Sequence, residues 1–136
     1  MERITSVKNE LIKRLRTLKT KKGRTEQNLF LVEGEKSVKE ALLWAKVEVL
    51  LTTHPQDWEG QETAKWVTPE VLGAVAATKT PQNVLAAVRI PKQKEVPEHG
   101  LLAALDGVQD PQNVGTIIRT AECAGAKACL LYTSPW

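Results

Sequence analysis

Apolar residues recur at helical spacing near the start of the chain. Three or four positions separate neighbours in the set Ile4, Val7, Leu11, Leu15 and Leu18. This spacing places all five on one face of an α-helix. Ser6 carries a side chain suited to an N-cap, so we expect a helix from Ser6 to about Thr20, after which Gly23 breaks the pattern.

Strand-like and helix-like patterns then alternate along the chain. Short apolar runs rich in β-branched residues, typical of buried strands, occupy residues 29–34, 47–53, 65–68 and 83–90. An amphipathic helix is expected over residues 35–45, and another begins at Pro69 with Thr68 as its N-cap. The alternation predicts a compact α/β layer of about 90 residues.

A break in composition follows this first block. Residues 91–100, PKQKEVPEHG, contain two prolines and a terminal glycine and have almost no apolar side chains, as in a domain linker. We therefore predict a first domain in residues 1–92, a linker in residues 93–100 and the beginning of a second domain in residues 101–136.

The second domain begins with a β-α-β pattern. LLAALDGV (101–108) is nearly continuous in apolar residues, as in a strand buried on both faces of a parallel sheet. One face of a predicted helix carries Val114, Ile117, Ile118 and Ala121, and Gly125 ends this helix. KACLLYT (127–133) then begins a second strand, and this sheet would need further strands to be complete.

Charge is informative through its distribution. The chain is 42% hydrophobic and 26% charged, a globular composition. Its net charge of +3 is too small to imply nucleic acid binding. However, the segment 8–24 holds one acid, Glu10, against a set of basic residues: Lys8, Lys13, Arg14, Arg16, Lys19, Lys21, Lys22 and Arg24. Such a segment suits an RNA backbone, although a solvated helix face is an equally good interpretation.

Several other features narrow the class of protein. Cys123 and Cys129 lack metal-site spacing and lie in apolar surroundings, so we interpret them as small buried thiols. No apolar run approaches the roughly 18–20 residues needed to span a bilayer, and a cytoplasmic location is expected. Among the tryptophans, we expect Trp44 to pack against the sheet and Trp58, in a polar loop, to be available for stacking on RNA bases.

The residues best suited to chemistry lie between the strand and helix of the second domain. In open α/β sheets, ligands bind at the carboxyl ends of strands, which is where Asp110 to Gly115 fall. Asn113 can cap the helix or present its amide to a ligand, and the first-turn amides offer an anion site. Gly115 allows close backbone approach, and Arg119 can form a forked contact with phosphate. Spacing alone leaves open a plain helix cap, by Asp110 or Asn113, and a surface arginine.

The whole of this segment resembles a known motif. LDGVQDPQNVGTIIRTAECAGA is similar to the first signature motif of the SpoU (TrmH-type) branch of the SPOUT RNA methyltransferases. The matching positions are Asp110, Pro111, Asn113, Gly115, Ile117, Ile118, Arg119, Thr120, Ala121 and Gly125. The N-terminal part resembles the family's substrate-binding domain, a small α/β sandwich also found in RNA-binding ribosomal proteins. Its matching positions are Ser6, Asn9, the cluster 21–24, and residues 30–34 and 81–86.

The resemblance implies 2′-O-methylation of a ribose in ribosomal or transfer RNA, with S-adenosylmethionine as the methyl donor. It places Asn113 and Arg119 in the active site, where Arg119 would contact the phosphate beside the ribose and assist removal of the hydroxyl proton. Lys21, Lys22 and Arg24 are expected to contact RNA from a glycine-containing turn, with a solvated loop as the alternative. Family members are homodimers through a knotted domain.

The sequence also departs from the family. The motifs that complete the knot and hold the cofactor do not occur in these 136 residues, and Ser134, Pro135 and Trp136 match no part of the family pattern. We therefore expect an incomplete SPOUT domain that neither binds S-adenosylmethionine nor methylates by itself, and that arises from a truncated gene, a fragment or foreign sequence at the end of the chain. The alternative hypothesis is a non-catalytic module that binds structured RNA.

Overall fold

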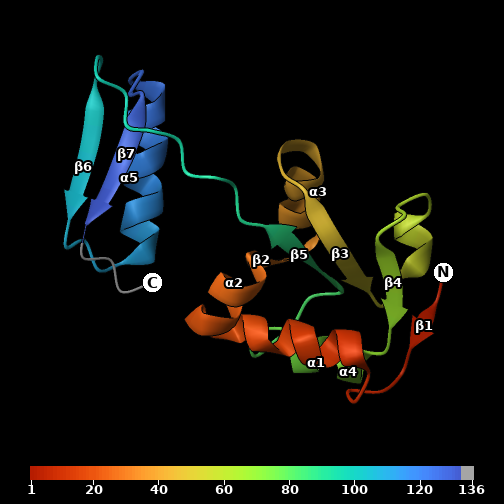
Figure 1. Ribbon diagram of the computed structural model, residues 1–136. Coiled ribbons are helices and arrows are strands. Elements are labelled where there is room, and N and C mark those ends of the chain that lie inside the picture. The colour runs from red at the N-terminus through yellow and green to blue at the C-terminus, as the bar shows by residue number, and fades with distance from the viewer. Residues whose placement is uncertain (133–136) are drawn as a thin grey trace. The chain divides into compact units, whose positions relative to one another are not determined.

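The protein consists of two compact units joined by an extended segment (Figure 1). A computed structural model describes residues 1–132. Unit 1 comprises Met1–Pro91, and unit 2 begins at Lys92. No helix among the described residues is long and apolar enough to cross a membrane.

Unit 1 is built on a five-stranded mixed sheet. Its strand order is β1-β4-β3-β5-β2. The strands are β1 (Arg3–Ile4), β2 (Leu29–Glu33), β3 (Val47–Thr52), β4 (Ala64–Val67) and β5 (Val84–Arg89). β1, β4 and β3 are mutually parallel, whereas β5 runs antiparallel to both β3 and β2. Consequently β2 runs in the same direction as β3. The four strands that share this direction, which are β1, β2, β3 and β4, have their carboxyl ends at the same edge of the sheet.

Helices cover both faces of this sheet. They are α1 (Glu10–Arg16), α2 (Lys21–Gln27), α3 (Glu35–Trp44) and α4 (Pro69–Val75), with 3₁₀ turns η1 (Thr17–Lys19) and η2 (Pro55–Trp58). α1 and α4 lie side by side on one face (Figure 1), and α3 packs on the other face. Unit 1 is therefore the α/β sandwich that the resemblance implies, and it has three layers.

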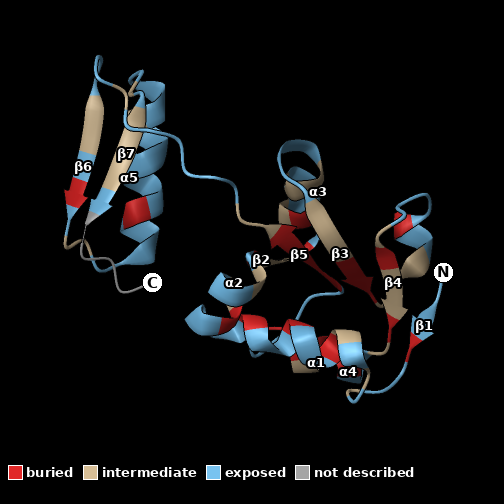
Figure 2. Ribbon diagram, viewed as in Figure 1, coloured by how far each residue is buried: buried red, intermediate tan, exposed pale blue. Residues whose placement is uncertain are grey.

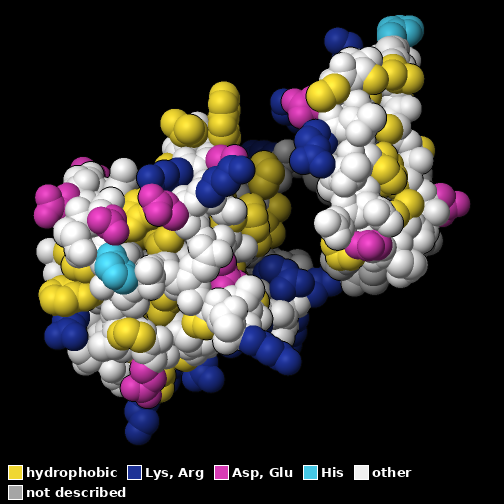
Figure 3. All heavy atoms as spheres, turned by 180° about the vertical axis from the view of Figure 1, so that it is seen from behind, with side chains coloured by type: hydrophobic (Ala, Val, Ile, Leu, Met, Phe, Trp, Pro, Cys, Tyr) yellow, Lys and Arg dark blue, Asp and Glu magenta, His cyan; other side chains and the backbone are white. Residues whose placement is uncertain are grey.

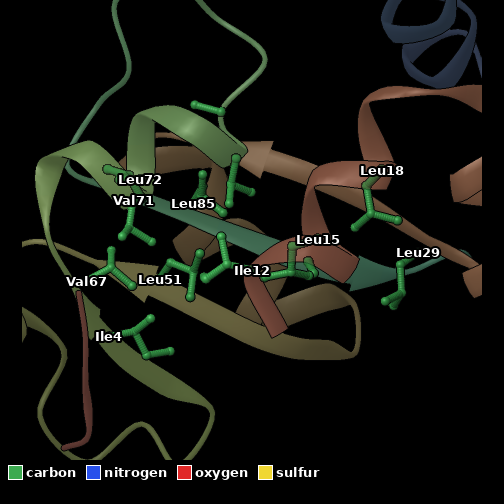
Figure 4. Close-up of a cluster of buried hydrophobic side chains, with 13 residues drawn as sticks. Ile4, Ile12, Leu15, Leu18, Leu29, Leu51, Val67, Val71, Leu72 and Leu85 are labelled. Carbon is green, nitrogen blue, oxygen red and sulfur yellow. The ribbon is translucent and has the colours of Figure 1, made fainter. Parts of the chain in front are cut away.

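The sheet separates two hydrophobic clusters. Alternation along β3 and β5 sends Leu51 and Leu85 into the cluster beneath α1 and α4, and Leu50 and Val84 into the cluster beneath α3. This is the two-residue period of a strand whose two faces are both covered. Figure 4 shows the first cluster, and Figure 2 shows buried residues concentrated in the central strands.

The first helix differs from the prediction in its start and length. Asn9, rather than Ser6, is the N-cap, because the side chain of Asn9 accepts a hydrogen bond from the amide of Leu11 at 2.9 Å. Ser6 accepts from the amide of Lys8 instead. Ile4 belongs to β1, where it pairs with Val67. Sequence periodicity does not reveal this pairing because it joins residues far apart along the chain.

Gly23 also behaves differently from the prediction. It lies inside α2 and is buried, and its amide donates to the Thr20 hydroxyl, the N-cap of that helix, at 3.1 Å. A Cβ at position 23 would lie 1.9 Å from the carbonyl oxygen of Thr17. Gly23 is therefore required by close packing rather than by a break in the chain. The helix ends at Asn28, which has a left-handed backbone with φ of 57°.

The remaining elements of unit 1 are confirmed within a residue or two. β2, β3, β4 and β5 occupy the predicted strand segments, and α3 the predicted helix. Thr68 caps α4 by accepting from the amide of Val71, with Pro69 in the first helical turn.

The two tryptophan predictions are wrong. Trp44, at the end of α3, is 87% exposed, whereas Trp58, in η2, is 6% exposed and packs in the cluster beneath α3. The outward position of Trp44 follows from Val38, which fixes the buried side of the helix. The 3₁₀ turn directs the Trp58 side chain into the core. The residues next to Trp58 in the sequence are polar, so the sequence gave no indication that Trp58 is buried.

Unit 2 is a β-α-β unit, as predicted. It contains β6 (Leu102–Asp106), α5 (Pro111–Cys123) and β7 (Ala128–Tyr132), with β6 and β7 parallel. Among residues 92–131 of this unit, whose burial is described, only Leu105 of β6 and Val114 of α5 are buried. β6 is therefore not covered on both faces as expected, because it has one strand neighbour and one helix within residues 92–132.

Candidate functional site

The motif segment forms a strand–loop–helix corner in unit 2. Gly107, with φ of 73°, turns the chain after β6. Asp110 then caps α5: its carboxylate accepts from the amide of Gln112 at 2.9 Å, and its carbonyl accepts from Val114. Asp110, and not Asn113, is therefore the helix cap. Because this carboxylate already binds a first-turn amide, the predicted anion site at these amides is occupied by the chain's own acid.

Asn113 and Arg119 both project from α5 and are exposed. Six residues of an α-helix correspond to about 9 Å along the axis and roughly 120° around it. The two side chains therefore leave the helix in different directions, and the helix alone does not bring them together. No atom lies within 4 Å of a Cβ built at Gly115 in the part of the chain that is described, so the expected close backbone approach is not made there.

The corner is open to solvent. Asp106, Gln109 and Asp110 are exposed, and Ile117 and Ile118 on α5 are 38% and 37% exposed. Sites for ligands of cofactor size bury roughly 70–90% of the ligand surface. These residues do not enclose such a ligand, and therefore they do not constitute a site for S-adenosylmethionine by themselves.

The basic cluster of unit 1 lies on a helix, not in the predicted turn. Lys21 and Lys22 are exposed in the first turn of α2. Lys22 lies 3.9 Å from the carboxylate of Glu26. Arg24 is half-buried and donates to the carbonyl of Leu18 at 3.1 Å. Lys21 and Lys22 are thus exposed to solvent, with Lys22 in a long contact with Glu26, whereas part of the Arg24 guanidinium supports the fold. Figure 3 shows basic and acidic side chains interspersed on one side of the protein.

Sequence reasoning missed a second polar region, at the carboxyl ends of β2 and β3. Glu33 accepts from the amide of Ala77 at 3.1 Å and from the hydroxyl of Thr78 at 2.9 Å. The amide of Thr53 donates to the carbonyl of Asn83 at 3.0 Å. The sequence gave a partial indication of this region, because residues 30–34 and 81–86 are both among the positions that match the family pattern. Only the fold places them together.

Comparison with known proteins defines the class first. Residues 9–86 match the family model of the MRM3-like substrate binding domain. This match covers most of unit 1, and the strand–loop–helix corner of unit 2 carries the SpoU-type motif. The chain belongs to the MRM3-like substrate-binding family found in SpoU (TrmH-type) RNA methyltransferases.

Individual relatives agree with this class. The chain is 40% identical to the 23S rRNA (guanosine(2553)-2′-O)-methyltransferase RlmP of Bacillus subtilis, over 96% of this chain and 54% of that protein. It resembles an AdoMet-bound rRNA methyltransferase from Sinorhizobium meliloti with a TM-score of 0.77 and 31% identity, over 99% of this chain and 56% of the other.

A TrmH-family RNA methyltransferase from Porphyromonas gingivalis has a TM-score of 0.76 and 34% identity, over 94% of this chain and 53% of its own. The chain therefore spans about half the length of the relatives it matches.

Proposed function

We propose that this chain provides the RNA-binding domain and the first β-α-β unit of an S-adenosylmethionine-dependent 2′-O-ribose methyltransferase that acts on ribosomal or transfer RNA. The observation that carries the proposal is the combination of both family features in one chain. Residues 9–86 match a substrate-binding domain, and the SpoU-type motif follows at a strand–loop–helix corner. The Bacillus subtilis relative, named as an rRNA 2′-O-methyltransferase, aligns across both.

The proposal assigns a task to each region. Residues 1–92 bind RNA, residues 93–100 link the domains, and residues 101–136 begin the methyltransferase domain, which would act in the cytoplasm as a homodimer. In that domain Asn113 contacts the ribose and Arg119 positions the neighbouring phosphate. A ribose hydroxyl is a poor nucleophile, so orientation and charge stabilisation are the main contributions expected of the protein. Arginine stays protonated near neutral pH, and phosphate positioning is therefore the primary role proposed for Arg119.

Residues 1–136 alone are proposed to bind RNA without transferring a methyl group. The exposed corner around Asn113 and Arg119 lacks the walls that a cofactor requires. Isothermal titration of the chain with S-adenosylmethionine should give no saturable heat in the micromolar range. Micromolar binding would contradict this part of the proposal and would favour a chain that is competent by itself.

The RNA-binding part is tested by filter binding with 23S rRNA transcripts over a range of salt concentrations. Retention should fall with salt, because released counterions drive phosphate binding. Lys21→Ala and Lys22→Ala should each reduce the slope of log K against log salt by about 0.7–0.9. Lys65→Ala, on β4, serves as the control and should leave the slope unchanged.

Arg24→Ala should lower thermal stability as well as RNA affinity, because Arg24 also supports the Leu18 carbonyl. Absence of any salt-dependent retention would contradict RNA binding, both for the methyltransferase and for the alternative of a non-catalytic RNA-binding module.

A further inference from the structure

The carboxyl edge of the unit 1 sheet gathers chain segments that are distant in sequence. β2 and β3 end at this edge, and the antiparallel β5 begins there. The segment entering β5 therefore lies beside the segments leaving β2 and β3. The α2 cluster containing Lys21 and Lys22 precedes β2, so it lies at the opposite, amino edge. A five-residue strand separates the two edges by about 16 Å.

The loop before β5 is held in place at this edge. All of residues 77–83 are exposed, yet both ends of the loop are anchored. Glu33 binds Ala77 and Thr78 at one end, and Thr53 binds the carbonyl of Asn83 at the other. Gln82 packs so closely on Gly34 that a Cβ at position 34 would lie 2.8 Å from the Gln82 amide oxygen. Exposed polar residues held in this way are suited to recognition.

A pocket of about 300 Å³ lies between this loop and the segment after β3. Its polar lining residues are Glu35, His54, Asp57, Gln82 and Asn83. Pro81 and Trp58 add apolar surface. Pockets for small molecules span roughly 300–1,000 Å³, so this one lies at the small end of that range, and a single base is a ligand of suitable size.

The lining favours a ligand that donates hydrogen bonds. Asp57 is exposed and forms no ion pair within residues 1–132, so its carboxylate is free to accept. Glu35 is held by Lys39 at 2.6 Å, which leaves its second oxygen as an acceptor. Ionised carboxylates only accept hydrogen bonds, whereas amide side chains such as Gln82 both donate and accept. The Watson–Crick edge of guanine presents two neighbouring donors, N1–H and N2–H, and its O6 accepts.

Basic residues border the pocket without lining it. Lys36 is exposed in the first turn of α3, in a groove that shares Glu35 and Gln82 with the pocket. Lys79 is exposed in the anchored loop. Both lysines would be available to contact phosphates of an RNA whose base enters the pocket. Proteins read unpaired RNA bases in this way, by their hydrogen-bonding edges and the adjoining backbone.

We propose that this pocket binds one unpaired guanine of the RNA substrate, with Asp57 accepting hydrogen bonds from its Watson–Crick edge and Gln82 completing the contact. The inference rests on the proposed RNA-binding function and extends it, since it adds a base-reading site at the edge opposite to Lys21 and Lys22. The guanine bound here is a recognition element and need not be the nucleotide that is modified.

The test uses residues 1–136 and three nine-nucleotide RNAs, oligouridines whose central residue is guanosine, inosine or uridine. Inosine lacks only the 2-amino group. Fluorescence anisotropy competition should show the guanosine RNA binding about tenfold more tightly than the other two, as expected for base-edge contacts. Asp57→Asn should reduce the ratio of guanosine to inosine affinity to about one.

Glu59→Gln is the matched control. Glu59 lies two residues from Asp57, is exposed, and lines a different groove. Its substitution removes the same charge and should keep the tenfold preference. Gln82→Ala, with an unchanged circular dichroism spectrum, should weaken guanosine binding and leave uridine binding unchanged.

Equal affinity of the unsubstituted protein for the three RNAs would overturn the guanine pocket. If that equal binding still fell with salt and depended on Lys21 and Lys22, the proposed RNA-binding function would remain intact. Equal loss of preference in Asp57→Asn and Glu59→Gln would also overturn the pocket, because it would reflect charge alone. Failure to bind any RNA would overturn both proposals.

Discussion

Two glycines in helices illustrate opposite packing constraints at the scale of single residues. A Cβ at Gly23 would meet the Thr17 carbonyl at 1.9 Å, whereas one at Gly115 meets nothing within 4 Å among the described atoms. Gly23→Ala should therefore destabilise unit 1 by about 2–4 kcal/mol. Gly115→Ala should stabilise α5 by roughly 1 kcal/mol through helix propensity.

Denaturant unfolding measures the first change, and amide hydrogen exchange in α5 measures the second. A Gly23→Ala protein as stable as the original would contradict the packing argument, because it would mean that α2 and η1 separate at little cost.

Trp44 and Trp58 give a second contrast between residues of the same type. Trp58 is 6% exposed within a core cluster, and Trp44 is 87% exposed. Trp58→Ala should cost about 3–5 kcal/mol of unfolding free energy, while Trp44→Ala should change it by less than about 0.5 kcal/mol. Thermal unfolding followed by circular dichroism distinguishes them. Similar losses for both would indicate that the exposed ring is covered in solution.

At the scale of elements, one ion pair connects neighbouring strands. Arg89 of β5 donates from Nε to the Glu48 carboxylate of β3 at 2.9 Å, and its Nη2 contacts the same oxygen. The hydrogen bond from Arg89 lowers the pKa of Glu48 below its usual value of 4.5. A lowered carboxyl pKa contributes stability above that usual value, and this contribution is lost as pH falls through the lower pKa of the folded state.

Glu48→Gln should therefore destabilise unit 1 at pH 7, by about 0.5 kcal/mol because both side chains are partly exposed. The difference between the two proteins should shrink as pH falls below 4.5, where the carboxyl begins to protonate in the unfolded chain. Urea unfolding at several pH values measures this. A difference that stays constant with pH would show that the effect of the substitution is steric.

Elements with a strong local pattern were predictable from the sequence, and elements defined by distant contacts were not. β5 is a continuous apolar run buried on both faces, and Thr68 with Pro69 is a local start signal for α4, so both were found. β1 has two residues and exists because Ile4 pairs with Val67. α2 depends on the contact of Gly23 with Thr17, which the sequence pattern presented as a break.

The candidate sites show the same division. The motif located the corner at residues 105–125, but both Asp110 and Asn113 are good caps, and sequence alone does not choose between them. The anchored loop was missed because Glu33 and Thr78 lie 45 residues apart in sequence. The roles of Asn113 and Arg119 remain predictions, and the filter-binding variants of Lys21, Lys22 and Arg24 described above test the α2 cluster.

At the scale of the whole molecule, the segment that joins the two units offers sites for proteolysis between them. Residues 91–96 are exposed and lack regular structure. Trypsin at low concentration should therefore cleave first after Lys92 and Lys94. The N-terminal product should keep its circular dichroism spectrum and a cooperative thermal transition, because both hydrophobic clusters of unit 1 lie within residues 1–91.

Mass spectrometry identifies the first products of this digestion. Initial cleavage inside unit 1, or an N-terminal product without a thermal transition, would contradict the proposed domain boundary.

The pairing of β1 with β4 has a consequence for the order in which the protein is assembled on the ribosome. Arg3 and Ile4 are synthesised well before their partners, Trp66 and Val67. Until then the N-terminal segment has no place in the sheet, and closing so long a loop is entropically costly. We expect α3, β3 and the other local elements to form first, and the N-terminal strand to dock last, as the step that completes the edge of the nascent domain.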